Sequence, residues 1–275
     1  MKRKKLIGKI VSYVVLSIGA VIMVLPFIWM LSTAFKPQAE VFRLPPSLIG
    51  SRIEFGNFNR VSARFPFWLF FLNSLKISAI VVIAQLVTSS MAGFGFARLK
   101  FRGRETLFFF YLATMMIPAQ VTIIPNFLLM GNLGLVNTHQ ALYLPALVSA
   151  FGTFLMRQFF ITVPPALEEA AKIDGCTPFG VYWRVFLPLS TPMTATLAIF
   201  VLMSIWNEYY NPLIYITTIE KMTLPLGLAL MQGMYSTDWT VLMAGTTLSL
   251  IPIITAFLLA QDLFVKGVML SGVKE

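Results

Sequence analysis

Four polar side chains lie at helical spacing inside a long apolar stretch of the sequence. They occupy positions i, i+3, i+4 and i+7, on one face of a helix: Ser204, Asn207, Glu208 and Asn211. Aromatic residues flank them, namely Trp206, Tyr209 and Tyr210. Amides and carboxylates hydrogen-bond to hydroxyls, and aromatic faces can pack on a ring, so these four residues with Tyr210 could line a carbohydrate path. The alternative is an aromatic belt at a membrane surface, with the amides joining neighbouring helices.

Metal-binding and nucleophilic side chains are scarce. His139 is the only histidine and Cys176 the only cysteine among 275 residues. A single cysteine excludes an intrachain disulfide and a CxxC metal site, and a single histidine removes most imidazole-based chemistry. A membrane-embedded enzyme would need clustered His, Cys, Asp or Glu, whereas Glu208 is the only carboxylate well inside an apolar stretch. We expect no catalytic residue, no metal and no cofactor.

The composition predicts an all-α polytopic membrane protein. Hydrophobic residues make up 57% of the chain and charged residues 12%, which is about half the charged fraction of a soluble domain. The mean hydropathy is +0.80. Six apolar stretches are each long enough to cross about 30 Å of hydrocarbon as a helix. We predict one transmembrane domain over residues 1–275, with spans at roughly 10–31, 69–96, 107–130, 141–160, 192–216 and 240–263.

The positive charge of the chain indicates its orientation rather than an anionic ligand. The net charge is +10, and Lys and Arg form short clusters between uncharged stretches, so nucleic-acid binding is not expected. With the amino terminus inside, fourteen of the 21 basic residues fall on the inner side, and five of the others occupy one long loop, 36–68. Long loops count little in the positive-inside rule. We expect both termini to be cytoplasmic, and the first span, too long for a signal peptide, to be retained.

The segment 161–190, on the predicted inner side, is longer than a connection between two spans requires. A pair of prolines begins a short helix there, and Glu168 and Glu169 fall in its first turn, where acidic side chains favour the positive helix end. Gly175 occupies the place of a left-handed C-terminal cap. These signals predict a short, capped helix.

A second short helix is predicted after it. Thr177 and Pro178 form an N-cap and N1 pair, and we expect this helix to end before Pro188, which lacks an N–H donor. On the first helix, Ala170 and Ala171 leave little side-chain bulk, so that helix can lie inside a groove of another protein. The simpler interpretation is that these residues are ordinary caps and helix formers.

Taken together, the segment resembles the EAA loop of ABC-importer permeases, whose pattern is E-A-A-x3-G-x9-I-x-L-P. It reads Glu169-Ala170-Ala171, three residues, Gly175, nine residues and Val185-Phe186-Leu187-Pro188. Only Val185, in place of Ile, departs from the pattern. The match lies two spans from the carboxyl terminus, where the family has it.

Other stretches resemble the sugar-transporting branch of that family. Trp206 to Pro212 is similar to its WNE-x-x-x-P stretch, and Asn73-Ser74, the run from 92 to 97 and the ending at 264–274 fit the same branch. The whole chain is therefore similar to the shorter, six-span permease of maltose-type carbohydrate importers. The resemblance implies a type I ABC-importer permease architecture in a bacterial or archaeal cytoplasmic membrane.

The resemblance also implies partners. In this family the EAA loop is a coupling helix that docks in a cleft of a cytoplasmic ATPase dimer, and this chain has no G-x-x-x-x-G-K-[ST] phosphate loop of its own. It would then be a transport subunit rather than an enzyme, in a heterodimer with a second, homologous permease. The residues that would contact the ATPase or shape the loop are Glu168, Glu169, Ala170, Ala171, Asp174, Gly175, Leu187 and Pro188.

The outer segment 217–238 is also longer than a connection needs. By resemblance it would reach into an extracytoplasmic sugar-binding protein, with contacts from Gln232, Gly233, Tyr235 and Ser236. An interfacial helix, in contact with membrane lipid, is the alternative, because residues 224–234 are mostly apolar.

Two other functions share part of this pattern. A permease for another solute, such as an amino acid or a phosphate ester, would have the same EAA loop. A secondary transporter would not require that loop and would usually carry more buried ionisable groups. The sequence does not identify the sugar, because the binding protein and the partner permease share that choice.

Overall fold

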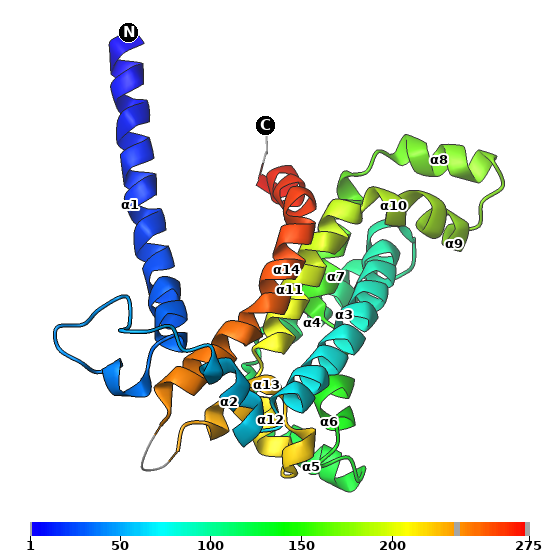
Figure 1. Cartoon of the computed structure of the whole chain (residues 1–275). Coiled ribbons are helices and arrows are strands. Elements are labelled where there is room, and N and C mark those ends of the chain that lie inside the picture. The colour runs from blue at the N-terminus through cyan, green and yellow to red at the C-terminus, as the bar shows by residue number, and fades with distance from the viewer. Residues whose placement is uncertain (1, 234–236, 273–275) are drawn as a thin grey trace. The chain divides into compact units, whose positions relative to one another are not determined.

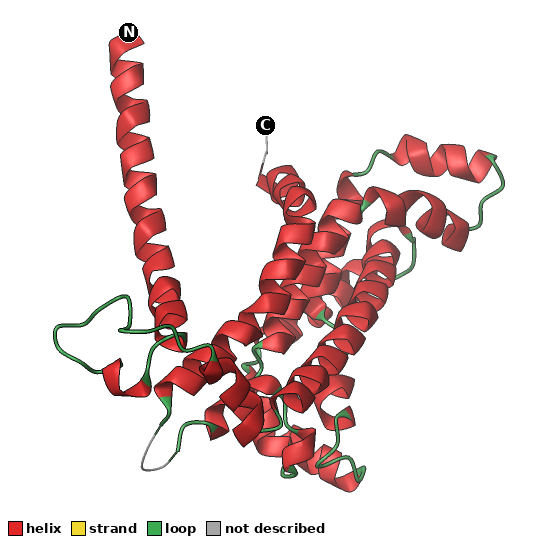
Figure 2. Ribbon diagram, viewed as in Figure 1, coloured by secondary structure: helices red, strands yellow, loops and turns green. Residues whose placement is uncertain are grey.

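The computed structural model describes residues 2–233 and 237–272, with side chains for 8–63, 65–233 and 237–263. Its described residues form helices joined by turns, and the pairing between them is limited to one isolated antiparallel bridge, from Gln232 to Thr237 (Figures 1 and 2). The all-α class expected from the sequence is confirmed.

The chain divides into two compact units. The first comprises Met1–Phe67 and Leu228–Ile251, and the second Trp68–Gly227 and Pro252–Glu275. The helices of the first unit are α1 (Lys2–Ala34), η1 (Gln38–Glu40), α2 (Gly56–Arg64) and the first part of α14 (Trp239–Gly272). The second unit holds most of the spans and both candidate sites described below.

The helices of the second unit follow one another with short breaks. In chain order they are α3 (Phe67–Arg98), α4 (Arg104–Ala113), η2 (Thr114–Met116), α5 (Ala119–Asn132), α6 (Gln140–Tyr143), η3 (Leu144–Ala146), α7 (Ala150–Thr162), α8 (Pro165–Ile173), α9 (Pro178–Val181), η4 (Tyr182–Phe186), α10 (Leu187–Leu189), α11 (Thr191–Trp206), α12 (Tyr210–Tyr215), η5 (Ile219–Lys221) and α13 (Leu224–Leu230). The remainder of α14 also belongs to this unit.

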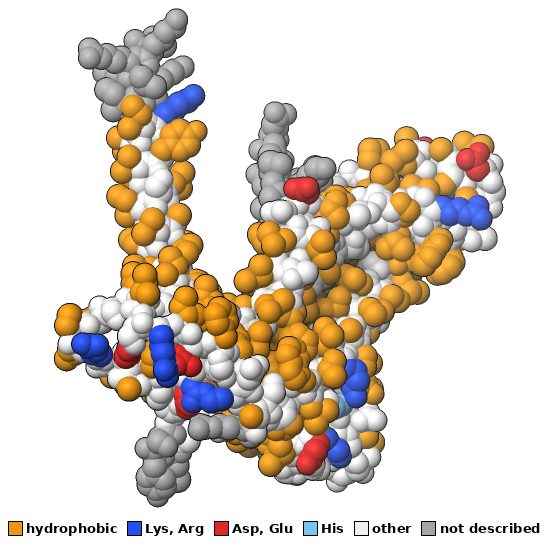
Figure 3. Space-filling model, in the orientation of Figure 1, with side chains coloured by type: hydrophobic (Ala, Val, Ile, Leu, Met, Phe, Trp, Pro, Cys, Tyr) orange, Lys and Arg blue, Asp and Glu red, His pale blue; other side chains and the backbone are white. Residues whose placement is uncertain are grey.

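Among the described residues, four helices are long and apolar enough to cross a membrane, and two bent pairs bring the number to six if each pair counts as one span. The four are Gly8–Ala34, Phe67–Arg98, Gln140–Thr162 and Trp239–Leu263. On the face shown in Figure 3, hydrophobic side chains cover most of the long helices, and charged side chains gather at helix ends and in connections. This distribution is that of a multi-pass membrane protein.

The third predicted span is not one straight helix. The structure replaces the expected helix over 107–130 with Arg104–Met116 and Ala119–Asn132, bent by 95°. Pro118 explains the break, because the residue before a proline is driven out of the helical region. Ile117 accordingly has φ −82° and ψ 114°.

The second helix of the 161–190 segment does not end before Pro188, contrary to the sequence prediction. It continues as Pro178–Leu189 and meets Thr191–Trp206 at an angle of 77°. The five residues from Tyr182 to Phe186 form a π-helical turn just before the proline. Such a wide turn makes room for a proline ring, which would otherwise clash with the carbonyl four residues earlier.

The core of the second unit joins α3, α7, η4 and α11. Its fully buried side chains include Val81, Met156, Phe160, Phe186 and Leu197. Small residues bring α3 and α7 together: a Cβ atom at Gly93 would lie 2.7 Å from Met156 Cβ, and one at Gly152 would lie 2.3 Å from Ser89 Oγ. The small residues within 89–97 thus allow α3 and α7 to pack closely.

A side chain added at Gly93 should push α3 and α7 apart, whereas one added at a nearby glycine should not. We expect Gly93→Ala to lower stability by about 1–3 kcal/mol, because the added methyl group overpacks the contact with α7. Gly95→Ala is the matched control, since a Cβ there meets nothing within 4 Å, and it should leave stability unchanged or slightly raised. Thermal unfolding of the purified protein in detergent measures both, and equal effects would contradict this packing.

Candidate functional site

The helix α8 ends in the cap predicted for it. Gly175 has φ +82°, in the left-handed region. The Gly175 N–H donates to the Lys172 carbonyl at 3.0 Å, and the Cys176 N–H donates to the Ala171 carbonyl at 2.9 Å. These two bonds form a Schellman motif, which satisfies carbonyls that the end of the helix would leave free. The turn between the two arms of the segment is thereby fixed.

The second arm begins as predicted too. Thr177 is the N-cap of α9, and its Oγ1 accepts from the Gly180 N–H at 3.2 Å, with Pro178 as the first helical residue. In Figure 1, α8 runs back alongside the α9–α10 arm. The buried Tyr182 hydroxyl lies 2.8 Å from Ser90 Oγ and ties this arm to α3.

The residues predicted to contact the ATPase or to shape the loop differ in their exposure to solvent. Five are exposed, namely Glu169, Ala170, Asp174, Gly175 and Pro188. Glu168 and Leu187 are half-buried, and Ala171 is buried in the core of the second unit. Because α8 begins at Pro165, only Glu168 falls in its first turn, and Glu169 lies beyond it.

Sequence reasoning missed Ile173. This large apolar side chain is 86% exposed at the end of α8, on the side of the helix where Glu169 and Ala170 also face outward. Its helical spacing from Glu169 and Ala170, at i+4 and i+3, was the available signal. The outer surface of α8 therefore combines small, acidic and apolar side chains.

The polar stripe predicted over 204–211 is not continuous, and this is a correction. The helix α11 ends at Trp206 and α12 begins at Tyr210. Pro212 explains the break, because a proline cannot bond to the carbonyl four residues earlier, which is that of Glu208. The freed chain is capped locally: Asn207 Nδ2 donates to the Met203 carbonyl at 2.8 Å, and Glu208 Oε1 accepts from the Asn211 N–H at 3.1 Å.

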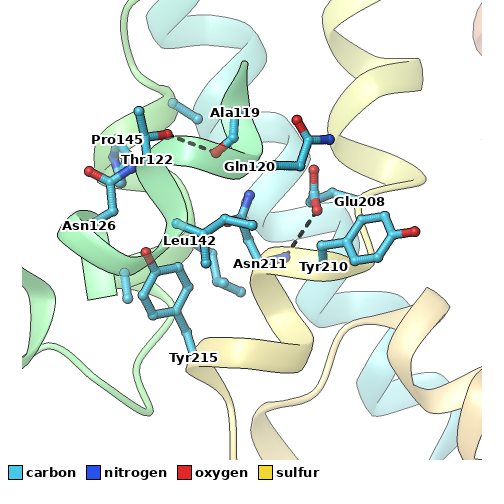
Figure 4. A pocket seen from close by; sticks show the side chains of 13 residues that line it. Ala119, Gln120, Thr122, Asn126, Leu142, Pro145, Glu208, Tyr210, Asn211 and Tyr215 are labelled. Atoms are coloured by element: carbon cyan, nitrogen blue, oxygen red, sulfur yellow. Dashed lines mark hydrogen bonds between the residues drawn. The ribbon is translucent and has the colours of Figure 1, made fainter. Parts of the chain in front are cut away.

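The break opens a cavity of ≈ 570 Å³ in the second unit (Figure 4). Three of the five predicted path residues line it, namely Glu208, Tyr210 and Asn211. Ser204 instead lines a separate cavity of ≈ 400 Å³, and Asn207 lies in neither. The predicted path residues are thus partly brought together.

The opposite walls come from α5 and from the α6–η3 segment. The polar side chains of α5 on this wall are Gln120, Thr122 and Asn126, and Tyr215 joins them from α12. None of the described residues lining the cavity is a Lys, Arg or His. The cavity therefore offers amide, hydroxyl and carboxylate groups with aromatic surface, but no cation.

Asn137 holds the ends of two cavity walls together. It has φ 60°, and its Oδ1 accepts from the N–H groups of Thr217 and Thr218, both at 3.1 Å. Its Nδ2 donates to Thr218 Oγ1 at 2.6 Å, and its carbonyl accepts from Lys221 Nζ at 2.8 Å. The turn after α5 is thus fastened to the segment after α12.

His139, the residue before α6, also contacts the segment after α12. It is half-buried, and its Nε2 lies 2.9 Å from the Lys221 carbonyl oxygen. Burial lowers the pKa of His139 from its ordinary value, and the charges of Lys76 and Lys221 lower it further. His139 therefore provides a second contact between the turn after α5 and the segment after α12.

Asn73 and Ser74 position the segment before α13. Asn73 Nδ2 donates to the carbonyls of Glu220 and Met222, each at 2.9 Å, and Ser74 Oγ accepts from the Leu224 N–H at 2.8 Å. Leu224 and Gly227 of α13 are buried. This part of α13 therefore packs on α3.

Only part of the predicted binding-protein contact can be located. Gln232 and Gly233 are exposed in the first unit, and Gly233 lines a cavity of ≈ 300 Å³ beside Thr237 and Asp238. Tyr235 and Ser236 lie outside the described residues.

Residues 85–270 match the family described as "Binding-protein-dependent transport system inner membrane component". The chain belongs to this family. The matched range contains the 161–190 segment and every residue lining the ≈ 570 Å³ cavity. The resemblance to ABC-importer permeases noted from the sequence is therefore confirmed, and the chain is a multi-pass membrane component of a transport system.

Relatives and a solved structure agree over nearly the whole chain. The permease is 36% identical to the arabinooligosaccharides transport system permease protein AraQ of Halalkalibacterium halodurans, covering 100% of both chains. It is 31% identical to the sn-glycerol-3-phosphate transport system permease protein UgpE of Escherichia coli, over 94% of this chain and 95% of UgpE. It also matches a crystal structure of a bacterial ABC transporter involved in the import of the acidic polysaccharide alginate, with a TM-score of 0.84 and 27% identity over 95% of this chain and 98% of that one.

The fastening by Asn137 gives a direct prediction for the permease. Asn137→Gly retains a residue that accepts positive φ but removes three side-chain hydrogen bonds, so we expect a loss of about 1–3 kcal/mol in stability. Asn132→Ala, at the exposed end of α5, is the control and should change stability by less than about 0.5 kcal/mol. Thermal unfolding in detergent compares the two, and similar midpoints would argue against the fastening.

Proposed function

We propose that this permease forms half of the membrane path for a sugar or oligosaccharide and couples it to a separate ATPase through the 161–190 segment. The observation that carries this proposal is the helix α8: it is capped at Gly175, anchored in the core through Ala171, and exposed along Glu169, Ala170 and Ile173. A helix held firmly on one side and open on the other is suited to docking in a groove.

Energy for transport must come from outside the chain, because its sequence contains no phosphate-binding loop. A docked helix transmits work if it binds the open and closed states of a partner with different affinity. The small side chain of Ala170 permits a close approach, and Glu169 and Asp174 offer exposed carboxylates for polar contacts. We therefore place α8 on the cytoplasmic side, against an ATPase dimer, with both termini on that side.

Support for a carbohydrate comes from the cavity and from the relatives. The cavity volume of ≈ 570 Å³ lies within the usual range of ligand sites, about 300–1,000 Å³. Its amides, its tyrosines and Glu208 match the hydroxyl groups and ring faces of a sugar. The names of AraQ and of the alginate transporter both refer to carbohydrates.

A phosphate ester is the second candidate solute, favoured by the similarity to UgpE. The cavity chemistry opposes it. A phosphate group needs Arg, Lys or clustered N–H donors, whereas the one formally charged group among the lining residues is the Glu208 carboxylate. A neutral, hydroxylated solute fits these groups better.

The remaining partners follow from the same proposal. A second, homologous permease would complete the wall of the path. An extracytoplasmic sugar-binding protein would dock on the outer side of the membrane, at the segment that includes Gln232 and Gly233, both exposed. The family description, which names dependence on a binding protein, supports this partner.

Substitutions in α8 should uncouple the ATPase. We expect Gly175→Val, which cannot adopt φ +82° without strain, and Glu169→Lys, which reverses an exposed charge, to abolish transport-coupled ATPase stimulation. Allosteric coupling of this kind is typically about 5- to 150-fold in affinity. Uptake and ATPase activity of the reconstituted transporter measure the effect.

Gly134→Val is the matched control, because Gly134 also has positive φ and open space but lies after α5. It should insert, assemble and remain coupled. Normal uptake with either Gly175→Val or Glu169→Lys would sink the assignment of α8 as the coupling helix.

Substitution of Glu208 tests whether the solute path runs through the cavity that this residue lines. Glu208→Gln keeps the oxygen that caps α12 but removes the charge from the cavity, so we expect unchanged thermal stability and an uptake of labelled arabinooligosaccharide reduced about tenfold, as for loss of one charged hydrogen bond. Ser204→Ala, in the separate cavity, should transport normally. If Ser204→Ala were the impaired variant and Glu208→Gln the normal one, the path would have to run through the other cavity.

A further inference from the structure

Arg98, the last residue of α3, lies largely shielded from solvent where α3, α7 and the 161–190 segment meet. Only 11% of its side chain is exposed. Its Nε and Nη2 donate to the Phe160 carbonyl at 3.1 Å and 2.5 Å, and Nη2 also donates to the Val163 carbonyl. One guanidinium thus donates hydrogen bonds to two carbonyls at the end of α7.

The same guanidinium reaches both arms of the 161–190 segment. Its Nη1 lies 3.8 Å from Glu168 Oε2 on α8, where Lys172 Nζ also donates to Oε1 at 2.6 Å. Its central carbon lies 4.9 Å from the centre of the Phe186 ring in η4. Arg98 therefore touches the segment at its beginning, on its first arm and on its second arm.

The chemistry of these contacts requires an arginine. The last carbonyls of a helix lack partners within the helix, and a cation there also favours the negative helix end. A guanidinium presents five donors in a rigid plane and stacks on an aromatic face, whereas an ammonium is a point charge that does neither. A lysine could retain the attraction to Glu168 but not the full set of contacts.

We propose that Arg98 is the positioning residue that fixes the orientation of α8 on the membrane helices. Its contacts to Val163 just before α8, to Glu168 on α8 and to Phe186 in η4 connect the start and both arms of the segment to the end of α3. Movement of α8 is then transmitted to α3 and α7 instead of being lost in a flexible hinge. This inference rests on the proposed coupling function of α8 and adds the residue that makes the coupling rigid.

A merely stabilising role would have different consequences. If Arg98 only contributed to stability, its loss would lower the unfolding temperature and leave the surviving folded molecules fully coupled. If it orients α8, folded and assembled molecules lose coupling while basal ATPase activity remains. The two roles are separated by the ratio of stimulated to basal ATPase activity in assembled transporters.

Cys176 supplies a readout in the permease alone. It is the only cysteine of the chain, lies directly after Gly175 and is partly buried against the core. Alkylation of this thiol by N-ethylmaleimide therefore reports the loosening of the segment without any partner present.

The experiment compares Arg98→Gln and Arg98→Lys with Arg184→Gln, an exposed arginine of the same segment. We expect Cys176 to be alkylated several-fold faster in Arg98→Gln, less so in Arg98→Lys, and at the unsubstituted rate in Arg184→Gln. In the reconstituted transporter, stimulated ATPase activity should fall in the same order while basal activity stays constant.

An unchanged alkylation rate in Arg98→Gln would overturn the inference. So would faster alkylation with full ATPase stimulation, provided that Gly175→Val is uncoupled in the same preparation. If Gly175→Val is also fully coupled, the failure lies in the proposed coupling function itself, so the two failures are distinguishable.

Discussion

Every backbone polar group that lies inside a membrane must find its partner within the protein, and the second unit is organised around this constraint. Polar side chains meet several of the places where its helices break or end. Gln85 Nε2 donates to the Ala146 carbonyl at 2.7 Å, and Thr88 Oγ1 donates to the Leu147 carbonyl at 3.0 Å, just before α7 begins. At the other end of α7, Arg98 meets the carbonyls that the helix leaves open. Polar residues of α3 thereby decide where α7 can start and stop.

The same constraint connects the cavity with the loop segment. The break after Trp206 is possible because Asn207 and Glu208 satisfy groups that the interrupted helix would expose. It also turns the chain so that Tyr210 and Asn211 face the cavity. Polar residues therefore have two uses in this fold: they permit a break, and the break creates the space that they line. A cavity formed in this way needs few ionisable groups, which agrees with the low charged fraction of the chain.

Local signals in the sequence were sufficient for the caps of the 161–190 segment, but not for the end of its second helix or for the cavity. Gly175 and Thr177 could be assigned because their cap roles depend only on neighbouring residues. The spacing of the polar set at 204–211 fits a continuous helix and predicts one stripe, but the helix is interrupted before Pro212. Gln120 and Asn126 could not be assigned to the same cavity, because a pairing of α5 with α12 depends on the tertiary fold. The contacts of Arg98 were hidden for the same reason: its partners lie 62 or more residues away.

The orientation of α8 depends on how many residues the π-helical turn at Tyr182–Phe186 contains. Such a turn holds one residue more than an α-helical turn, and each residue of an α-helix rotates the chain by about 100°. A deletion of one residue within this turn would restore regular winding and rotate α9, and α8 with it, by roughly that angle relative to α11. The direction in which α8 presents its outer surface is therefore set by a count of residues as well as by their chemistry. Chains that differ by one residue here would present different surfaces from the same helices.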